Sequence, residues 1–364
     1  MNNALITFAK PNNEPVKSYK PGSAERIELQ KELERQSNEV VEIPAIIGGK
    51  EVRTGDMGEV VMPHDHKHVI ARYHKVGEKE VRMAIDAAQA AKKEWENTPW
   101  DERAAIMARV AELLATKYRA RINAATMLGQ SKNCFQAEID SACETIDFFR
   151  YNNHYATKLY AEQPASANDQ LNRTEYRPLE GFVFAITPFN FTSIASNLNM
   201  TPALMGNTTI WKPSTTALLS NYTDMRIFME AGLPAGVVNF LPGKGSLISN
   251  VALKDPNFNA IHFTGSTATF KNLWKTTGQN LDLYKSYPRL IGETGGKDFI
   301  FVHNSADPQE VAVAIVRGAF EYQGQKCSAA SRAYIPASMW NEVKNRVGDM
   351  MSTIKMGDVK DFTN

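Results

Sequence analysis

Between about residues 80 and 155, apolar positions recur with the period of an α-helix. Two sets of four residues each fall on one helical face; they are Ile106, Val110, Leu113 and Leu114, and Ile139, Ala142, Ile146 and Phe149. An Ala-rich run at 84–91 suits close packing between helices. We therefore expect this region to form a block of amphipathic helices.

From Arg177 onward, short apolar runs alternate with helical stretches. The runs lie at 181–186, 208–211, 237–241, 260–263 and 299–302, and the helical stretches at 192–205, 214–231, 246–253 and 266–280. Buried strands that alternate with helices are typical of a parallel sheet. The fold class predicted from this pattern is α/β.

The first part of the chain is patterned differently. Residues 1–40 are polar, contain three prolines and include one charged helical piece at Arg26–Arg35, which predicts an arm wrapped on the surface. Ile43–Ile47 and Lys50–Val52 flank Gly48-Gly49 and predict a hairpin, because glycine supplies the positive φ of a tight turn.

Composition and charge narrow the choice of function. The chain has 41 basic and 40 acidic side chains and a mean hydropathy of −0.36, which argue against nucleic acid or an anionic membrane as the main partner. No run reaches the roughly 18 apolar residues of a membrane span. Three cysteines are too few for a disulfide framework and fit a reducing compartment. With no secretory signal in view, we expect a cytoplasmic protein, with the mitochondrial matrix as the alternative.

The turns that follow the predicted strands are the first places to look for a site. In parallel sheets, ligands bind at the carboxyl ends of the strands. Asn190 lies in such a turn, where its amide could donate to a developing oxyanion or serve only as a turn residue. Lys212 ends the next strand and could equally be a surface lysine. The glycine pattern near Gly243 and Gly265 is a weak dinucleotide signal.

Cys327 and Glu293 are the candidates for covalent chemistry. Cys327 lies among polar residues rather than in a core pattern, and the neighbouring Lys326 could favour its thiolate. A nucleophile and a structural cysteine are about equally supported by this local sequence. Glu293 is flanked by glycines and could face a cleft, although a solvated loop acid would be the better interpretation of this motif alone. The alternating histidines of His64–His68 predict a surface strand, and we assign no metal.

Five motifs occur in the order found in aldehyde dehydrogenases, and the chain from about residue 40 resembles that family. They are Pro188-Phe-Asn-Phe191, Trp211-Lys-Pro-Ser214, Phe263-Thr-Gly-Ser266, Gly292-Glu-Thr-Gly-Gly-Lys297 and Gly324-Gln-Lys-Cys-Ser328. Further runs are similar to the 1-pyrroline-5-carboxylate dehydrogenase branch, which oxidises glutamate semialdehyde to glutamate in proline catabolism; they are Phe320–Ala329, Thr269–Trp274, Ala137–Asp140 and Ile146–Arg150.

The resemblance implies roles for individual residues. Cys327 would be the nucleophile, Asn190 an oxyanion donor and Glu293 the base that activates water. The cofactor would be NAD, held by a set of residues along one cleft: Thr187, Lys212, Gly265, Ser266 and Thr269. Ser328 would bind the carboxylate of the small-molecule substrate, and Phe191 would pack against its aliphatic part.

The same resemblance implies the domain organisation. An NAD-binding domain would cover residues 41–292, with an oligomerisation hairpin around 156–178, and a catalytic thiol domain would begin at 293. A homo-oligomer is expected, and coupling to a proline dehydrogenase is possible. Because members of the family continue well beyond residue 364, we expect this chain to lack part of the second domain and to be inactive or aggregation-prone alone.

Besides the shorter length, one departure from the family pattern and two alternative functions remain. Thr215 stands where many relatives have a glutamate that rejects NADP, so the preference for NAD is less strictly enforced. A reductase or CoA-acylating relative would release the thioester to another acceptor, and Glu293 argues against this. A non-enzymatic fragment is the second alternative, and the presence of Cys327, Glu293 and Asn190 argues against long decay.

Overall fold

A seven-stranded sheet forms the centre of the computed structural model, which describes residues 6–363. The strands lie in the order β10-β9-β6-β7-β8-β2-β3. Five of them are parallel: β6 (Phe182–Ile186), β7 (Thr208–Lys212), β8 (Val238–Phe240), β9 (Phe258–Gly265) and β10 (Arg289–Thr294). At one edge, β2 (Ala45–Ile47) and β3 (Lys50–Val52) form the predicted antiparallel hairpin. The α/β fold class is confirmed.

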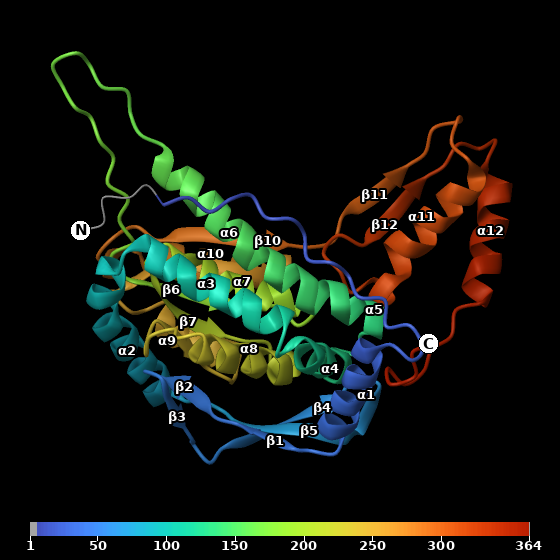
Figure 1. Cartoon of the computed structure of the whole chain (residues 1–364), viewed down its shortest axis with the longest axis horizontal. Helices are drawn as coiled ribbons and strands as arrows, with labels where there is room; N and C mark the ends of the chain where they lie inside the picture. The colour runs from blue at the N-terminus through green and yellow to red at the C-terminus, as the bar shows by residue number, and fades with distance from the viewer. Residues whose placement is uncertain (1–5, 364) are drawn as a thin grey trace.

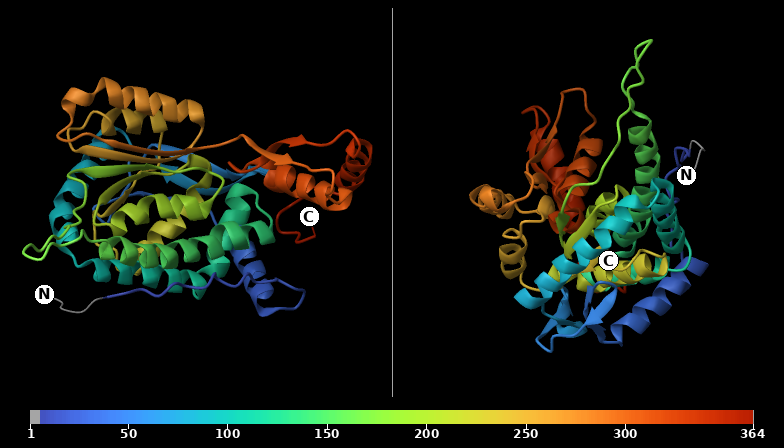
Figure 2. Two further views of the ribbon diagram at one scale, coloured as in Figure 1. Left: turned by 90° about the horizontal axis from the view of Figure 1, so that it is seen from above. Right: turned by 90° about the vertical axis from the view of Figure 1, so that its left-hand side faces the viewer.

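Helices cover both faces of this sheet, which explains why its central strands are apolar throughout (Figure 2). The helices that follow strands are α7 (Thr192–Leu204), α8 (Leu218–Glu230), α9 (Gly245–Ala252) and α10 (Thr267–Gln279). One buried cluster contains residues of α7 and α8, and the other contains residues of α9 and α10. Parallel strands buried on both faces need this double cover.

The predicted helical block is present, with one departure from regular α geometry. It comprises α2 (Glu78–Asn97), α3 (Trp100–Ala115), α4 (Arg119–Gln130), α5 (Cys134–Ala137), a π-helix (Glu138–Cys143) and α6 (Glu144–Ala161). In the π-helix the Glu144 N–H donates to Ile139 O, five residues back. This wider turn rotates Ile139 away from the apolar face, so it is only half-buried whereas Ala142, Ile146 and Phe149 are buried.

The N-terminal arm lies along α6 and reaches the π-helix (Figure 1). Glu138 has no exposed surface and accepts hydrogen bonds from Lys17 N at 2.8 Å and Tyr19 Oη at 2.7 Å, both on the arm. It also accepts from Asn123 Nδ2 at 2.8 Å and pairs with the Arg119 guanidinium. Burial opposes ionisation of Glu138, but these donors outweigh it and hold its pKa below the usual value. The arm is therefore bound by charge as well as by contact.

The predicted charged helical piece of the arm is α1 (Ala24–Ser37), which ends before a three-stranded sheet of β1 (Val41–Ile43), β5 (Asp65–His74) and β4 (Met57–Met62). His64 Nδ1 is hydrogen-bonded to Ser131 Oγ, and His68 Nε2 to Ser37 O. Among residues 6–363, no group of three or more His, Cys, Asp or Glu side chains could hold a metal ion.

The predicted oligomerisation hairpin begins later than expected. Helix α6 continues to Ala161, and residues 162–180 then project from the body as a loop that carries one β-bridge, between Ala167 and Gln170 (Figure 1). The helical pattern of α6 extends beyond residue 156, which the predicted bounds overlooked. Leu171 near the tip is 79% exposed.

The segment after β10 forms a smaller unit at one end of the molecule (Figures 1 and 2). It contains a two-stranded parallel sheet of β11 (Asp298–Phe301) and β12 (Ala330–Tyr334), with α11 (Pro308–Phe320) and α12 (Trp340–Ser352). The apolar run at 299–302 therefore lies outside the main sheet. Glu293 pairs in register with Thr264 inside β10, so the main sheet continues to Thr294, past the predicted boundary. In the part of the chain described, no helix is long and apolar enough to cross a membrane.

The buried contacts of Glu138 generate a prediction about stability. We expect Glu138→Gln to lower the free energy of unfolding by about 3 kcal/mol at pH 7, because Arg119 loses a buried counter-charge. Urea unfolding measures this difference. The matched control is Glu230→Gln, which removes an exposed ion pair with Lys117 and should cost much less.

The contribution of Glu138 to stability should depend on pH in a defined direction. Because the pKa of Glu138 is lowered in the folded state, its contribution is complete above the usual carboxyl pKa and is lost as the pH falls through the folded value. The difference between the wild type and Glu138→Gln should shrink in acid. Equal stability of the two proteins at pH 7 would contradict this account.

Candidate active site

A cavity of about 630 Å³ opens at the carboxyl ends of β6, β7 and β9. The loop that carries Cys327 closes its other side. Seven of the residues singled out in the sequence line it: Thr187, Asn190, Lys212, Gly265, Ser266, Thr269 and Cys327. The topology thus brings together residues that are up to 140 positions apart, as expected for the edge of a parallel sheet.

One wall of the cavity is the start of α10. Ser266 caps this helix: its Oγ accepts from Thr269 N at 3.2 Å and is hydrogen-bonded to Thr269 Oγ1 at 2.8 Å. At Gly265 a Cβ would come within 2.7 Å of the Phe263 ring, so only glycine fits there without a shift. The N–H groups of a helix start and its dipole together favour an anionic group such as a phosphate.

The opposite wall contains Lys212 and Thr187, which end β7 and follow β6. Burial lowers the pKa of Lys212, and no carboxylate of the described residues pairs with it. Thr187 is buried, and its Oγ1 accepts from Trp211 Nε1 at 2.9 Å. The lysine is therefore a desolvated donor that faces the cavity without a fixed partner.

Cys327 lies against the glycines that follow Glu293. A Cβ on Gly295 would be 3.2 Å from Cys327 Cα, and Gly296 N donates to Cys327 O at 3.2 Å. The Glu293 carboxylate is near enough to the Cys327 thiol to act on its pKa. Partial burial and then this carboxylate raise the thiol pKa to about 11. The structure therefore holds a protonated thiol next to a base that can accept its proton.

Asn190 reaches the same loop from the other side. Its Nδ2 donates to Gln325 O at 2.8 Å, and its Oδ1 is buried without a hydrogen-bond partner in the described residues. Gln325 is two residues before Cys327. The amide that was expected to face an oxyanion is thus hydrogen-bonded to the backbone beside the thiol.

The expected effect of Lys326 on the thiol is wrong for this structure. Its Nζ lies 3.4 Å from Asp140 Oδ2 and 3.5 Å from Glu321 Oε1, so its charge is paired with carboxylates. The pKa shift of Cys327 is upward, and Lys326 is not among its leading causes. Adjacent residues on a tight turn point in different directions, which sequence adjacency cannot reveal.

The two predicted substrate residues lie outside the lining of the cavity. Ser328 is exposed, and its backbone acts to lower the pKa of the Cys327 thiol. Phe191 is only 8% exposed and its ring packs under the Lys132 ammonium, 4.1 Å from Nζ. Sequence reasoning assigned no role to Lys132 or to Asp140, which sits in a motif used only as a family marker.

A model described as the aldehyde dehydrogenase family matches residues 51–364. The chain belongs to this family. It is 47% identical over 363 residues to the mitochondrial delta-1-pyrroline-5-carboxylate dehydrogenase of Dictyostelium discoideum, covering 99% of this chain and 65% of that protein. It is 50% identical to the delta-1-pyrroline-5-carboxylate dehydrogenase of Agaricus bisporus, covering 99% of this chain and 67% of that one.

A solved structure gives the same picture. The delta-pyrroline-5-carboxylate dehydrogenase of Mycobacterium tuberculosis bound with NAD superposes with a TM-score of 0.97 at 48% identity, covering 100% of this chain and 68% of that one. The family resemblance in the sequence is therefore confirmed. The chain spans about two thirds of the length of these relatives.

The burial of the three thiols predicts their relative reactivity. Cys134 and Cys143 are 8% and 4% exposed, and burial raises both pKa values to about 12. We expect iodoacetamide to modify Cys327 at least tenfold faster than either at pH 8, because Cys327 is more accessible and has a lower pKa. Peptide mass spectrometry against time measures the three rates. Modification of Cys134 or Cys143 first would contradict the described environments.

Proposed function

We propose that this chain carries the catalytic thiol of an NAD-dependent dehydrogenase that oxidises glutamate semialdehyde, formed from 1-pyrroline-5-carboxylate, to glutamate. The observation that carries the proposal is that the Glu293 carboxylate lies near enough to the Cys327 thiol to raise its pKa, at the edge of a cavity that Cys327 and Asn190 line. The names of the relatives from Dictyostelium, Agaricus and Mycobacterium support the choice of substrate.

The cavity fits a dinucleotide. The start of α10, with Ser266 and Thr269 at its cap, suits a pyrophosphate, and the tight Gly265 lets the backbone approach it. Lys212, which lacks a carboxylate partner in the described residues, would bind ribose hydroxyls, and Thr187 would line the same side. NAD would supply the hydride acceptor. The NAD bound to the Mycobacterium tuberculosis relative supports this cofactor.

The chain's own residues would then act in sequence. Glu293 accepts the proton of Cys327, whose pKa is too high for spontaneous ionisation at neutral pH. The thiolate bonds to the aldehyde carbon and gives a hemithioacetal oxyanion, which the Asn190 amide and a backbone N–H near Cys327 stabilise. Oxidation leaves a thioester on Cys327. Glu293 first passes the Cys327 proton to solvent and then takes a proton from water, whose oxygen attacks the thioester carbon. The C–S bond breaks, and glutamate and the Cys327 thiolate are released.

Asn190 must give up one contact to act in this way. Its Nδ2 is hydrogen-bonded to Gln325 O, so the amide has to share this donor with the oxyanion or use its second N–H. Ser328 remains our candidate for the substrate carboxylate, since its exposed hydroxyl lies next to Cys327 in sequence. Phe191 would support this pocket from beneath, because its ring is already buried.

A CoA-acylating or reductase activity is the second candidate. It would use the same thioester but another acceptor, and it is disfavoured because the Glu293 carboxylate lies near the thiol and is well placed to activate water. A homo-oligomer, coupling to a proline dehydrogenase and a cytoplasmic or matrix location stay predictions. Leu171 at the tip of the loop at 162–180 is one exposed apolar side chain that an oligomer could cover.

NADH formation tests the proposal. We expect glutamate semialdehyde to be oxidised with a kcat/KM at least a hundredfold above that of propanal, by this chain extended to the length of its relatives. Cys327→Ala should abolish turnover but leave NAD binding unchanged, because the thiol bonds the substrate and not the cofactor. Binding is followed by quenching of protein fluorescence.

A matched control is Cys143→Ala, which removes a buried thiol far from the cavity lining and should keep its turnover. Near-normal turnover in Cys327→Ala would rule out the proposed nucleophile. Equal kcat/KM values for both aldehydes would be consistent with an aldehyde dehydrogenase but would contradict the proposed preference for glutamate semialdehyde.

A further inference from the structure

The backbone before Cys327 is strained and anchored. We call residues 321–327 the nucleophile loop; within it, Tyr322 and Gln323 both have φ of 52°, in the left-handed region that side chains disfavour. Tyr322 is 1% exposed, and its Oη donates to Gln130 O at the end of α4, at 2.7 Å. Such strain persists only where surrounding contacts hold it.

The second anchor of the nucleophile loop is an ionic cluster that the proposed chemistry does not use. Asp140, in the π-helix, accepts from Lys132 Nζ at 2.7 Å, and the same Oδ2 lies 3.4 Å from Lys326 Nζ. Lys132 has no exposed surface, and the rings of Phe191 and Tyr322 pack on its ammonium at 4.1 and 4.6 Å. One carboxylate therefore holds two ammonium groups, and one of these belongs to the residue before Cys327.

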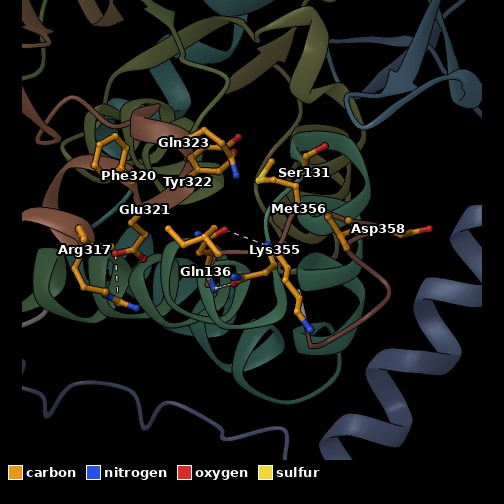
Figure 3. A pocket seen from close by; sticks show the side chains of 15 residues that line it. Ser131, Gln136, Arg317, Phe320, Glu321, Tyr322, Gln323, Lys355, Met356 and Asp358 are labelled. Carbon is orange, nitrogen blue, oxygen red and sulfur yellow. Dashed lines mark hydrogen bonds and ion pairs between the residues drawn. The ribbon is translucent and has the colours of Figure 1, made fainter. Parts of the chain in front are cut away.

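The charges around Lys326 come from three elements. Glu321 Oε1 lies 3.5 Å away on the nucleophile loop itself, and Arg317 of α11 pairs with Glu321 at 3.4 Å. Glu144 at the start of α6 also acts on both lysines through its charge. Figure 3 shows Arg317, Glu321 and Tyr322 beside a cavity of about 340 Å³. Asp140 is the carboxylate that ties this group to the π-helix.

We propose that Asp140 is a positioning residue for the nucleophile: its carboxylate holds the Lys326 ammonium against the π-helix and thereby fixes the peptide that carries Cys327. Two consequences follow for the active site. Gln325 O stays in place as the acceptor for Asn190, so the thiol and the amide keep their relative position. The Lys326 ammonium is also held on carboxylates, while burial and then Glu293 are the leading causes of the Cys327 pKa shift.

The π-helix makes this support rigid. Glu138 and Asp140 are two residues apart, and their carboxylates contact different partners, the arm with Arg119 on one side and Lys132 with Lys326 on the other. The wide turn buries both side chains at once. Asp140 is therefore attached to a segment whose own position is fixed by a second buried ion pair.

Alkylation of Cys327 as a function of pH tests the inference. In Asp140→Asn, Lys326 loses its ion pair with the π-helix and keeps only Glu321, which lies on the same loop, so its ammonium can move toward the thiol. We expect the midpoint of Cys327 alkylation by iodoacetamide to fall by about one unit, which is about tenfold faster modification below the midpoint. Loosening that exposes Cys327 would also lower the midpoint, because burial raises the pKa of this thiol. Adding Lys326→Met to Asp140→Asn tells the two causes apart, because only the effect of the Lys326 charge disappears with it.

The double variant Asp140→Asn with Lys326→Met is the matched control and should restore the wild-type midpoint. Lys326→Met alone should leave it nearly unchanged, because in the wild type Lys326 is paired with Asp140 and Glu321 and is not among the leading causes of the thiol pKa shift. If Asp140→Asn does not fold because Lys132 loses its counter-charge, Lys132→Met with Asp140→Asn removes both buried charges and still frees Lys326. A melting curve identifies this case.

An unchanged midpoint in a folded Asp140→Asn or Lys132→Met/Asp140→Asn protein would overturn the inference. So would a lowered midpoint that persists after Lys326→Met is added. The inference rests on the proposed function in taking Cys327 as the reacting thiol. The alkylation assay reads Cys327 without substrate or NAD, so failure of the dehydrogenase assay and failure of this test are separate results.

Discussion

Two buried carboxylates in a single π-helical turn connect the outer parts of this molecule to its candidate active site. Glu138 binds the N-terminal arm and Arg119, and Asp140 binds Lys132 and the residue before Cys327. Buried charges are costly unless they are paired, so the loss of one partner leaves the other as an uncompensated buried charge. This constraint explains why an arm that lies far from the cavity in sequence contacts the segment that supports the nucleophile loop.

Without substrate or cofactor, the charges around the cavity keep the Cys327 thiol unreactive. The thiol of Cys327 is protonated, because burial and Glu293 raise its pKa, while Lys326 is paired elsewhere. Asn190 is hydrogen-bonded to the nucleophile loop. Substrate and cofactor would have to change these contacts before chemistry begins, and Glu293 is the group near the thiol that can accept its proton. A thiol that ionises only when a base is correctly placed is protected from unwanted alkylation and oxidation.

Sequence patterns predicted helices and strands well where the spacing of apolar residues follows the buried face of the element. The parallel strands, the helices between them and the hairpin around Gly48-Gly49 lie close to their predicted bounds. The π-helix was missed because its residues also fit an α-helical period, and only the half-buried Ile139 reveals the wider turn. The strand at 299–302 was predicted correctly, but its run of residues does not specify which sheet it joins.

In the candidate site, too, some features could be predicted from the sequence and others could not. Strand ends predicted which residues meet at the cavity, since topology alone places Thr187, Lys212 and Gly265 on one edge. The sequence does not predict the direction in which a side chain points. The Lys326 ammonium pairs with Asp140, and the Phe191 ring packs on the Lys132 ammonium. Asp140 had no signal of its own, because a carboxylate in an apparently regular helix is usually solvent-exposed.

The most direct test of this account uses the Glu293→Gln variant of the chain extended to the length of its relatives. The variant is mixed with glutamate semialdehyde and NAD, and the Cys327 peptide is then examined by mass spectrometry. In this variant the Cys327 thiol can still ionise, because the carboxylate that raised its pKa is gone, but no base is left to activate water. If Cys327 bonds the substrate and Glu293 then activates water, a glutamyl thioester should therefore accumulate on the Cys327 peptide in this variant and disappear quickly in the wild type. Cys327→Ala in the same background should carry no adduct. A Cys327 peptide that stays unmodified while NADH is formed would contradict the account.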